Sequence, residues 1–162
     1  MAGNFVVVGM ADLKIVRAPQ VLTTIGLGSC VGIALYDPVT KIAGLAHIML
    51  PESAASQSNT NPAKFADTAT KKMLDEMVRM GAKKGYVNAK IAGGAQMFNF
   101  TSTNENLRVG DRNTEAAKRI LQSLRIPLIA EETGSTFGRT MELYSEDGRV
   151  AIKAIGQAIR YL

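Results

Sequence analysis

Residues 30–50 read CVGIALYDPVTKIAGLAHIML, two apolar runs separated by the segment DPVTK. Pro is favoured at the second position of a tight turn and Asp at the first, so residues 37–41 have the composition of a turn. Two short apolar runs joined in this way predict a β-hairpin, with strands at residues 30–36 and 42–50. The hairpin also contains the one Cys and the one His of the chain.

More strands are expected on both sides of this hairpin. Short apolar runs occur at residues 5–9, 13–16, 21–25, 86–92, 128–130, 140–144 and 150–154. Residues 63–80 and 114–124 instead carry apolar side chains every three or four positions, which predicts two helices. The polar residues 51–62 between hairpin and first helix predict a loop. Many strands with two helices that do not alternate one for one favour an α+β fold with a mixed sheet.

The composition is that of a soluble globular protein. The 162 residues are 46% apolar and 20% charged, and their number suits one domain spanning residues 1–162. No apolar run approaches the ~20 residues that span a bilayer, and the first residues do not resemble a signal peptide. A single Cys cannot form an internal disulfide, which favours a reducing compartment. We therefore expect a cytoplasmic protein with no membrane insertion.

The charge pattern argues against a nucleic-acid binder. The net charge of +5 is modest, the basic residues are scattered, and aromatic residues make up only 6% of the chain. Nucleic-acid binders usually gather basic residues in a stripe, often with aromatic side chains that stack on bases. The charge is therefore interpreted as that of an ordinary protein surface, with a mild preference for an acidic protein partner as the weaker alternative.

Cys30 and His47 lie on opposite strands of the predicted hairpin. If residues 38–39 form a two-residue turn, Asp37 pairs with Thr40, and Cys30 then lies directly across from His47. Directly opposed residues point to the same face with Cβ atoms about 5 Å apart. A turn longer or shorter by one residue would place the two side chains on opposite faces.

A thiol beside an imidazole is an arrangement suited to nucleophilic catalysis. An imidazolium favours the thiolate form of Cys30, and His47 can then protonate a leaving group and activate water. The imidazole needs a partner at its other nitrogen, and Thr23 and Thr24 are candidates. Backbone amides around Gly28, Ser29 and Cys30, after the glycine-containing turn, are candidates to bind a substrate oxyanion.

Other interpretations of these residues are weaker. A lone Cys is commonly a small buried apolar residue, and a lone His is commonly structural. One Cys and one His supply only two of the three or four ligands of a usual metal site, so no metal is expected. Residues 26–28, GLG, lack the third glycine of a dinucleotide-binding loop, so no cofactor is expected. Arg112, Asn113 and Arg139 are further candidates for lining a substrate cleft.

Six segments together resemble the chemoreceptor glutamine deamidase family, CheD. In chain order they are GLGSCVG (26–32), LYD (35–37), GLAHIMLP (44–51), GGAQMF (93–98), VGDRN (109–113) and TGSTFGR (133–139). The resemblance implies a catalytic triad of Cys30, His47 and Thr24, and a single-domain sandwich similar to deamidating bacterial toxin domains. It also implies an enzyme that converts specific chemoreceptor glutamines to glutamate through a Cys thioester, releases ammonia, and binds the chemotaxis phosphatase CheC.

Two rival functions follow from the same residues. The protein could be a non-catalytic chemotaxis adaptor that binds receptors and the CheC phosphatase. Alternatively, the same nucleophile could serve peptide cleavage, methyl-ester hydrolysis or transglutamination.

Overall fold

The hairpin predicted at residues 30–50 lies at the centre of a five-stranded sheet. The structure, a computed structural model, describes residues 4–53, 61–97 and 108–162. The strands of the sheet that contains the hairpin are, in order across it, β2 (Asp12–Arg17), β5 (Ile42–Ile48), β4 (Val31–Asp37), β6 (Asn88–Gly93) and β7 (Leu128–Thr133). β6 and β7 run parallel, whereas β4 is antiparallel to both of its neighbours, so the sheet is mixed.

A second five-stranded sheet lies against the first. Its strands are, in order, β1 (Phe5–Val7), β3 (Val21–Leu27), β8 (Arg139–Tyr144), β9 (Val150–Lys153) and β10 (Arg160–Tyr161). β1 runs parallel to β3, and the remaining neighbours are antiparallel. β10 has no counterpart among the predicted strands because two residues are too few to form a pattern.

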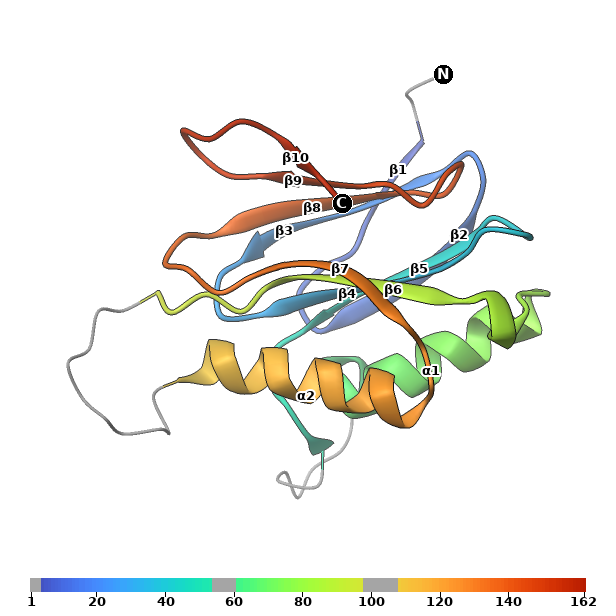
Figure 1. Cartoon of the computed structure of the whole chain (residues 1–162), viewed down its shortest axis with the longest axis horizontal. Helices are drawn as coiled ribbons and strands as arrows, with labels where there is room; N and C mark the ends of the chain where they lie inside the picture. The colour runs from blue at the N-terminus through green and yellow to red at the C-terminus, as the bar shows by residue number, and fades with distance from the viewer. Residues whose placement is uncertain (1–3, 54–60, 98–107) are drawn as a thin grey trace.

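Two helices complete a three-layer sandwich (Figure 1). α1 (Ala66–Arg79) and α2 (Val109–Ser123) cover the outer face of the sheet that contains the hairpin, and the second sheet covers its other face. Short 3₁₀ turns, η2 (Pro62–Lys64) and η3 (Lys84–Tyr86), lie before α1 and β6. The predicted α+β sandwich with mixed sheets and two main helices is therefore confirmed.

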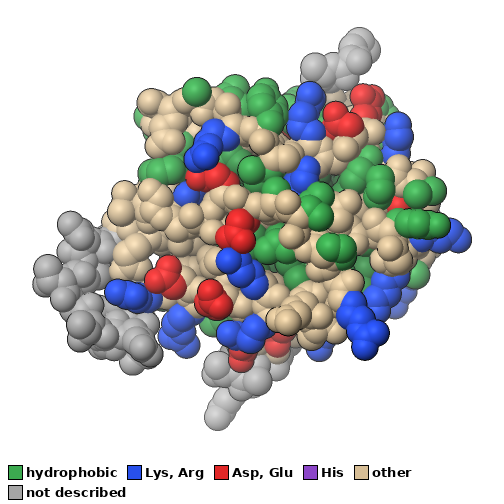
Figure 2. Space-filling view, viewed as in Figure 1, with side chains coloured by type: hydrophobic (Ala, Val, Ile, Leu, Met, Phe, Trp, Pro, Cys, Tyr) green, Lys and Arg blue, Asp and Glu red, His purple; other side chains and the backbone are tan. Residues whose placement is uncertain are grey.

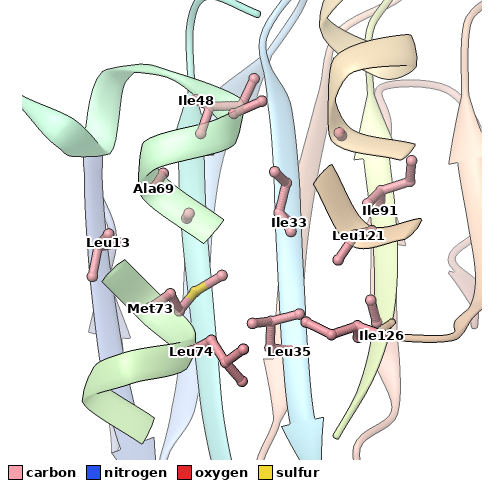
Figure 3. Close-up of a cluster of buried hydrophobic side chains, with 14 of the residues drawn as sticks. Leu13, Ile33, Leu35, Ile48, Ala69, Met73, Leu74, Ile91, Leu121 and Ile126 are labelled. Atoms are coloured by element: carbon pink, nitrogen blue, oxygen red, sulfur yellow. The ribbon is translucent and has the colours of Figure 1, made fainter. Parts of the chain in front are cut away.

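Each strand of the hairpin is buried on both faces. On one face, Ile33 and Leu35 pack with Met73 of α1 and Leu121 of α2 (Figure 3). On the other face, Ala34 and Leu45 pack with side chains of the second sheet, among them Leu22, Leu27, Met141 and Leu143. Burial on both faces explains why the two strands read as continuous apolar runs rather than as alternating ones.

α2 begins earlier than predicted. Its first residue is Val109 rather than 114, and Arg108 occupies the N-cap position. The first turn was missed because the predicted pattern relies on apolar side chains. In the segment VGDRN a polar residue, Asn113, occupies a buried position. α1 begins at Ala66, inside the predicted range 63–80, and residues 54–60 of the predicted loop lie outside the described residues.

The turn of the hairpin differs from the predicted two-residue turn. Asp37 pairs with Ile42, so four residues form the loop, and Lys41 adopts a positive φ of 57° within it. The Asp37 carboxylate accepts hydrogen bonds from Val39 N at 2.8 Å and from the Thr40 hydroxyl at 2.8 Å. This side chain stabilises the wider loop. As a result, the register of the two strands differs by two residues from the predicted register.

Charge of both signs is distributed over the surface. On the face drawn in Figure 2, Lys and Arg side chains lie among Asp and Glu side chains. Exposed ion pairs such as Lys72–Glu76 and Arg119–Glu52 mix the two signs further. In the described part of the chain, no helix has the length and apolar content needed to cross a membrane.

The Asp37 side chain provides a test of the loop. It is fully buried and also accepts a hydrogen bond from Lys83 N at 2.8 Å, so it joins the hairpin to the segment after α1. Asp37→Ala should lower the free energy of unfolding by about 2–3 kcal/mol, because several hydrogen bonds to a charged acceptor are lost. Urea unfolding measures this change. Asp147→Ala, at an exposed aspartate of the β8–β9 turn, is the control and should cost far less. Equal losses would contradict the role of Asp37.

Candidate active site

Cys30 and His47 belong to the same face of the hairpin sheet, the face that meets the second sheet. His47 pairs with Gly32 rather than with Cys30, which corrects the predicted direct opposition. The wider loop shifts the register by two residues, and an even shift keeps side chains on the same face. Cys30, just before β4, is thus diagonal to His47, an arrangement in which Cα atoms lie about 7–8 Å apart. Both side chains are buried, Cys30 with 8% of its surface exposed and His47 with none.

Thr24 on β3 fixes the orientation of the imidazole. The Thr24 hydroxyl oxygen lies 2.7 Å from His47 Nδ1 and 2.7 Å from the backbone oxygen of Val8. A carbonyl oxygen can only accept, so the single hydroxyl proton is donated to Val8. The hydroxyl must then accept the hydrogen bond from His47 Nδ1, which carries a proton.

The resulting tautomer leaves Nε2 of His47 as the basic nitrogen. Nε2 is buried and has no hydrogen-bond partner within the described residues. A neutral imidazole with Nδ1 protonated accepts a proton at Nε2. The arrangement therefore prepares His47 to act as a general base on the face that it shares with Cys30.

Burial favours the neutral forms of both residues. It raises the pKa of the Cys30 thiol, although a hydrogen bond from the residue's own backbone amide acts in the opposite direction. Burial lowers the pKa of His47. The sequence predicted an imidazolium that favours a thiolate, whereas these two shifts favour a thiol beside a neutral imidazole. Proton transfer to His47 would then accompany attack by the sulfur.

The backbone before β4 is held by the segment that follows β6. Gly94 N donates to Cys30 O at 2.9 Å, and Ala95 N donates to Gly28 O at 2.8 Å. Gly93, with a φ of +106°, permits this approach, because a Cβ atom there would collide with the Cys30 carbonyl oxygen. A glycine is required where two backbones come this close. The position of Cys30 thus depends on a segment more than 60 residues away in sequence.

The amides predicted to bind substrate differ in their availability. Gly28 N donates to Gly26 O at 3.0 Å, so this N–H is already used within the loop. The N–H groups of Ser29 and Cys30 have no backbone acceptor among the described residues. Interaction of the Cys30 N–H with its own sulfur acts to lower the thiol pKa, against the larger effect of burial. These two amides are the donors available to an oxyanion beside Cys30.

The three weaker candidates have different surroundings. Asn113 is fully buried and donates through Nδ2 to Ser29 O at 3.0 Å and to Met49 O at 2.9 Å, so it belongs to the site. Arg139 is buried in an ion pair with Glu132, which corrects its assignment to a cleft. Arg112 is exposed on α2.

Sequence reasoning missed Val8, whose carbonyl oxygen determines the tautomer of His47. It contributes a backbone atom, so no side-chain signal identified it. Among the described residues, no three His, Cys, Asp or Glu side chains are grouped as a metal site would require.

Comparisons with known proteins agree on one family. A family model described as CheD chemotactic sensory transduction matches residues 49–154. The chain is 49% identical over 162 residues to the "Probable chemoreceptor glutamine deamidase CheD" of Caldanaerobacter subterraneus subsp. tengcongensis, and the match covers 100% of both chains. It is 50% identical over 155 residues to the "Chemoreceptor glutamine deamidase CheD" of Halalkalibacterium halodurans, covering 95% of this chain and 96% of the relative.

A likeness to one solved structure is more distant. The hypothetical protein YfiH of Bacillus licheniformis has a TM-score of 0.49 and 16% identity, covering 77% of this chain and 51% of that chain. This likeness is too low to support an argument. The predicted similarity to deamidating toxin domains stays a prediction.

The protonation states of Cys30 and His47 can be tested by alkylation. Because burial raises the thiol pKa, the rate of Cys30 alkylation by iodoacetamide should still rise above about pH 8.5, where an ordinary thiol titrates. His47 is neutral throughout that range, since its pKa is lowered, and should add no inflection near neutral pH. Urea-unfolded protein, with an ordinary thiol, is the control. A rate that levels off below pH 7 would instead indicate a thiolate–imidazolium pair.

Proposed function

Because the chain belongs to the CheD family of chemotaxis proteins, we propose that it is a protein-glutamine deamidase acting on chemoreceptors. It converts the side-chain amides of specific glutamines to carboxylates and releases ammonia. The names and full-length identity of its relatives support the activity. The observation that carries the assignment of the site is the Thr24–His47 hydrogen bond, which leaves a basic Nε2 on the face that also bears the single Cys.

The first half of the reaction forms a thioester. The Cys30 sulfur attacks the amide carbon of the glutamine while His47 Nε2 takes the thiol proton. The negative charge moves to the former carbonyl oxygen, where the N–H groups of Ser29 and Cys30 stabilise it. His47 returns the proton to the amide nitrogen, the C–N bond breaks, and ammonia departs.

The second half hydrolyses the thioester. His47, neutral again, removes a proton from a water molecule that attacks the thioester carbon. The C–S bond breaks, the proton returns to sulfur, and glutamate remains on the receptor. Thr24 keeps Nδ1 protonated through both halves, so that the same nitrogen, Nε2, exchanges every proton.

The burial of the pair makes activation of the Cys30 thiol depend on His47. A neutral thiol is a weak nucleophile, so Cys30 is activated only when His47 can take its proton during attack.

We expect the protein to act in the cytoplasm, on the cytoplasmic helices of chemoreceptors, and to bind the CheC phosphatase. The resemblance of the sequence motifs to the family supports these partners.

The first test is the mass of the substrate. Incubation of a chemoreceptor cytoplasmic fragment with the protein should add about 1 Da per modified glutamine, as replacement of an amide by an acid requires. Cys30→Ala should lower the rate by roughly 10⁴-fold or more, because the thioester cannot form. Peptide mapping by mass spectrometry identifies the sites, and circular dichroism verifies that the variant is folded.

The outcomes separate the rival functions. Full activity in folded Cys30→Ala would refute the nucleophile. Binding of the fragment without any mass change would favour the adaptor function. Peptide cleavage, loss of a methyl ester or a cross-link would each give a different mass and identify another reaction.

A second test concerns Thr24. Thr24→Val keeps the shape of the side chain but removes the hydroxyl, so His47 loses the acceptor that fixes its tautomer. The turnover number should fall roughly 10- to 100-fold. Thr24→Ser, which retains the hydroxyl, is the matched control and should keep most of the activity. If the Val and Ser variants behaved alike, the hydroxyl would have no role in orienting His47.

A further inference from the structure

The three carbonyl groups around the nucleophile are all occupied by partners. Backbone amides hold the first and third, Ala95 N at Gly28 O and Gly94 N at Cys30 O. The second, Ser29 O, is held by a side chain, the NH₂ group of Asn113 at 3.0 Å. Asn113 is therefore the side chain that controls the peptide group joining Ser29 to Cys30.

The geometry of this peptide group connects Asn113 to the nucleophile. The Ser29 C=O and the Cys30 N–H share one planar trans peptide unit and point in opposite directions. When Asn113 holds the carbonyl, the Cys30 N–H must point away from α2. This N–H belongs to the residue that carries the sulfur, and its interaction with the sulfur acts to lower the thiol pKa. If the peptide group rotated, this donor would be directed away from the sulfur.

The same NH₂ group also reaches the strand that carries the base. It donates to Met49 O at 2.9 Å, two residues after His47. Both partners are carbonyl oxygens, so the atom between them must be the nitrogen of the amide. Its oxygen, Oδ1, is buried without a partner among the described residues. Asn113 thus connects the segments on either side of the catalytic pair through one NH₂ group.

The docking of α2 places Asn113 at this point. A Cβ atom at Gly110 would collide with the carbonyl oxygen of Ala95 and lie 2.6 Å from that of Gly94. Glycine in the first turn lets the helix rest on the same backbone that donates to Gly28 O and Cys30 O. The helix α2 therefore packs on residues 93–95, which in turn are hydrogen-bonded to residues 28–30.

We propose that Asn113 is a positioning residue for deamidation: by holding Ser29 O and Met49 O, it keeps the Cys30 N–H directed at the oxyanion that forms beside the sulfur. This inference rests on the proposed function. It assigns to α2 a role in transition-state stabilisation that acts through the backbone and not by contact with the reacting atoms.

The test uses two neutral variants of the full chain, Asn113→Ala and Asn113→Leu. Leu has the same branched side-chain skeleton as Asn but is larger and carries no charge, so it removes the donor without opening a cavity, whereas Ala removes the donor without adding bulk. Both variants should lower kcat on the receptor fragment about 10- to 100-fold, a part of the 10²–10³-fold cost of losing one oxyanion donor, with a smaller change in KM. The pH profile of Cys30 alkylation should also move to higher pH, because the thiolate loses its amide donor.

A control separates positioning from stability. Thr70→Ala removes a buried side-chain hydrogen bond from α1, which lies on the same face of the sheet. It should lower the melting temperature but leave kcat and the alkylation profile of the folded protein unchanged. Folded Asn113 variants with wild-type kcat and an unshifted profile would overturn the inference. A shifted profile with no mass change from any form of the protein, wild type included, would support the positioning of Cys30 and reject the deamidase function.

Discussion

The hydrogen bond between Thr24 and His47 is the contact on which the candidate site depends, because it joins the two sheets beside Cys30. Thr24 belongs to one sheet and His47 to the other, and the Val8 carbonyl settles the direction of the bond. A buried polar group without such a partner would be costly, so packing of the sheets and orientation of the imidazole stabilise each other. The same hydrogen bond therefore contributes both to the packing of the two sheets and to the orientation of His47.

The hairpin, both helices and the shared face of Cys30 and His47 could be predicted because they depend on local patterns. Turn composition and apolar periodicity require only neighbours in sequence. The register could not be predicted, because the Asp37 side chain stabilises a four-residue loop in place of a two-residue turn. The face was nevertheless correct, since the error was an even number of residues.

The roles in the site that escaped prediction depend on long-range contacts. Val8 contributes only a carbonyl oxygen, and Asn113 lies 83 positions after Cys30 in a segment whose polar composition hid the start of a helix. Asn113 was predicted only as a residue lining a substrate cleft, and neither residue carries a local signal for the hydrogen bond that it makes at the site. Arg139 had attracted attention because it is charged, yet it forms a buried ion pair with Glu132. Residue type alone did not separate an arginine in a buried ion pair from an asparagine bound to the backbone beside Cys30.

The site draws on all three layers, with Thr24 from one sheet, His47 from the other and Asn113 from the helices. A loosened, molten-globule-like state could keep every strand and helix while losing the fixed packing between layers. In that state no bond across the layers would hold the imidazole or the Cys30 amide. Far-ultraviolet circular dichroism would then record an intact protein that has no working site, so enzymatic activity is the more sensitive gauge of its native packing.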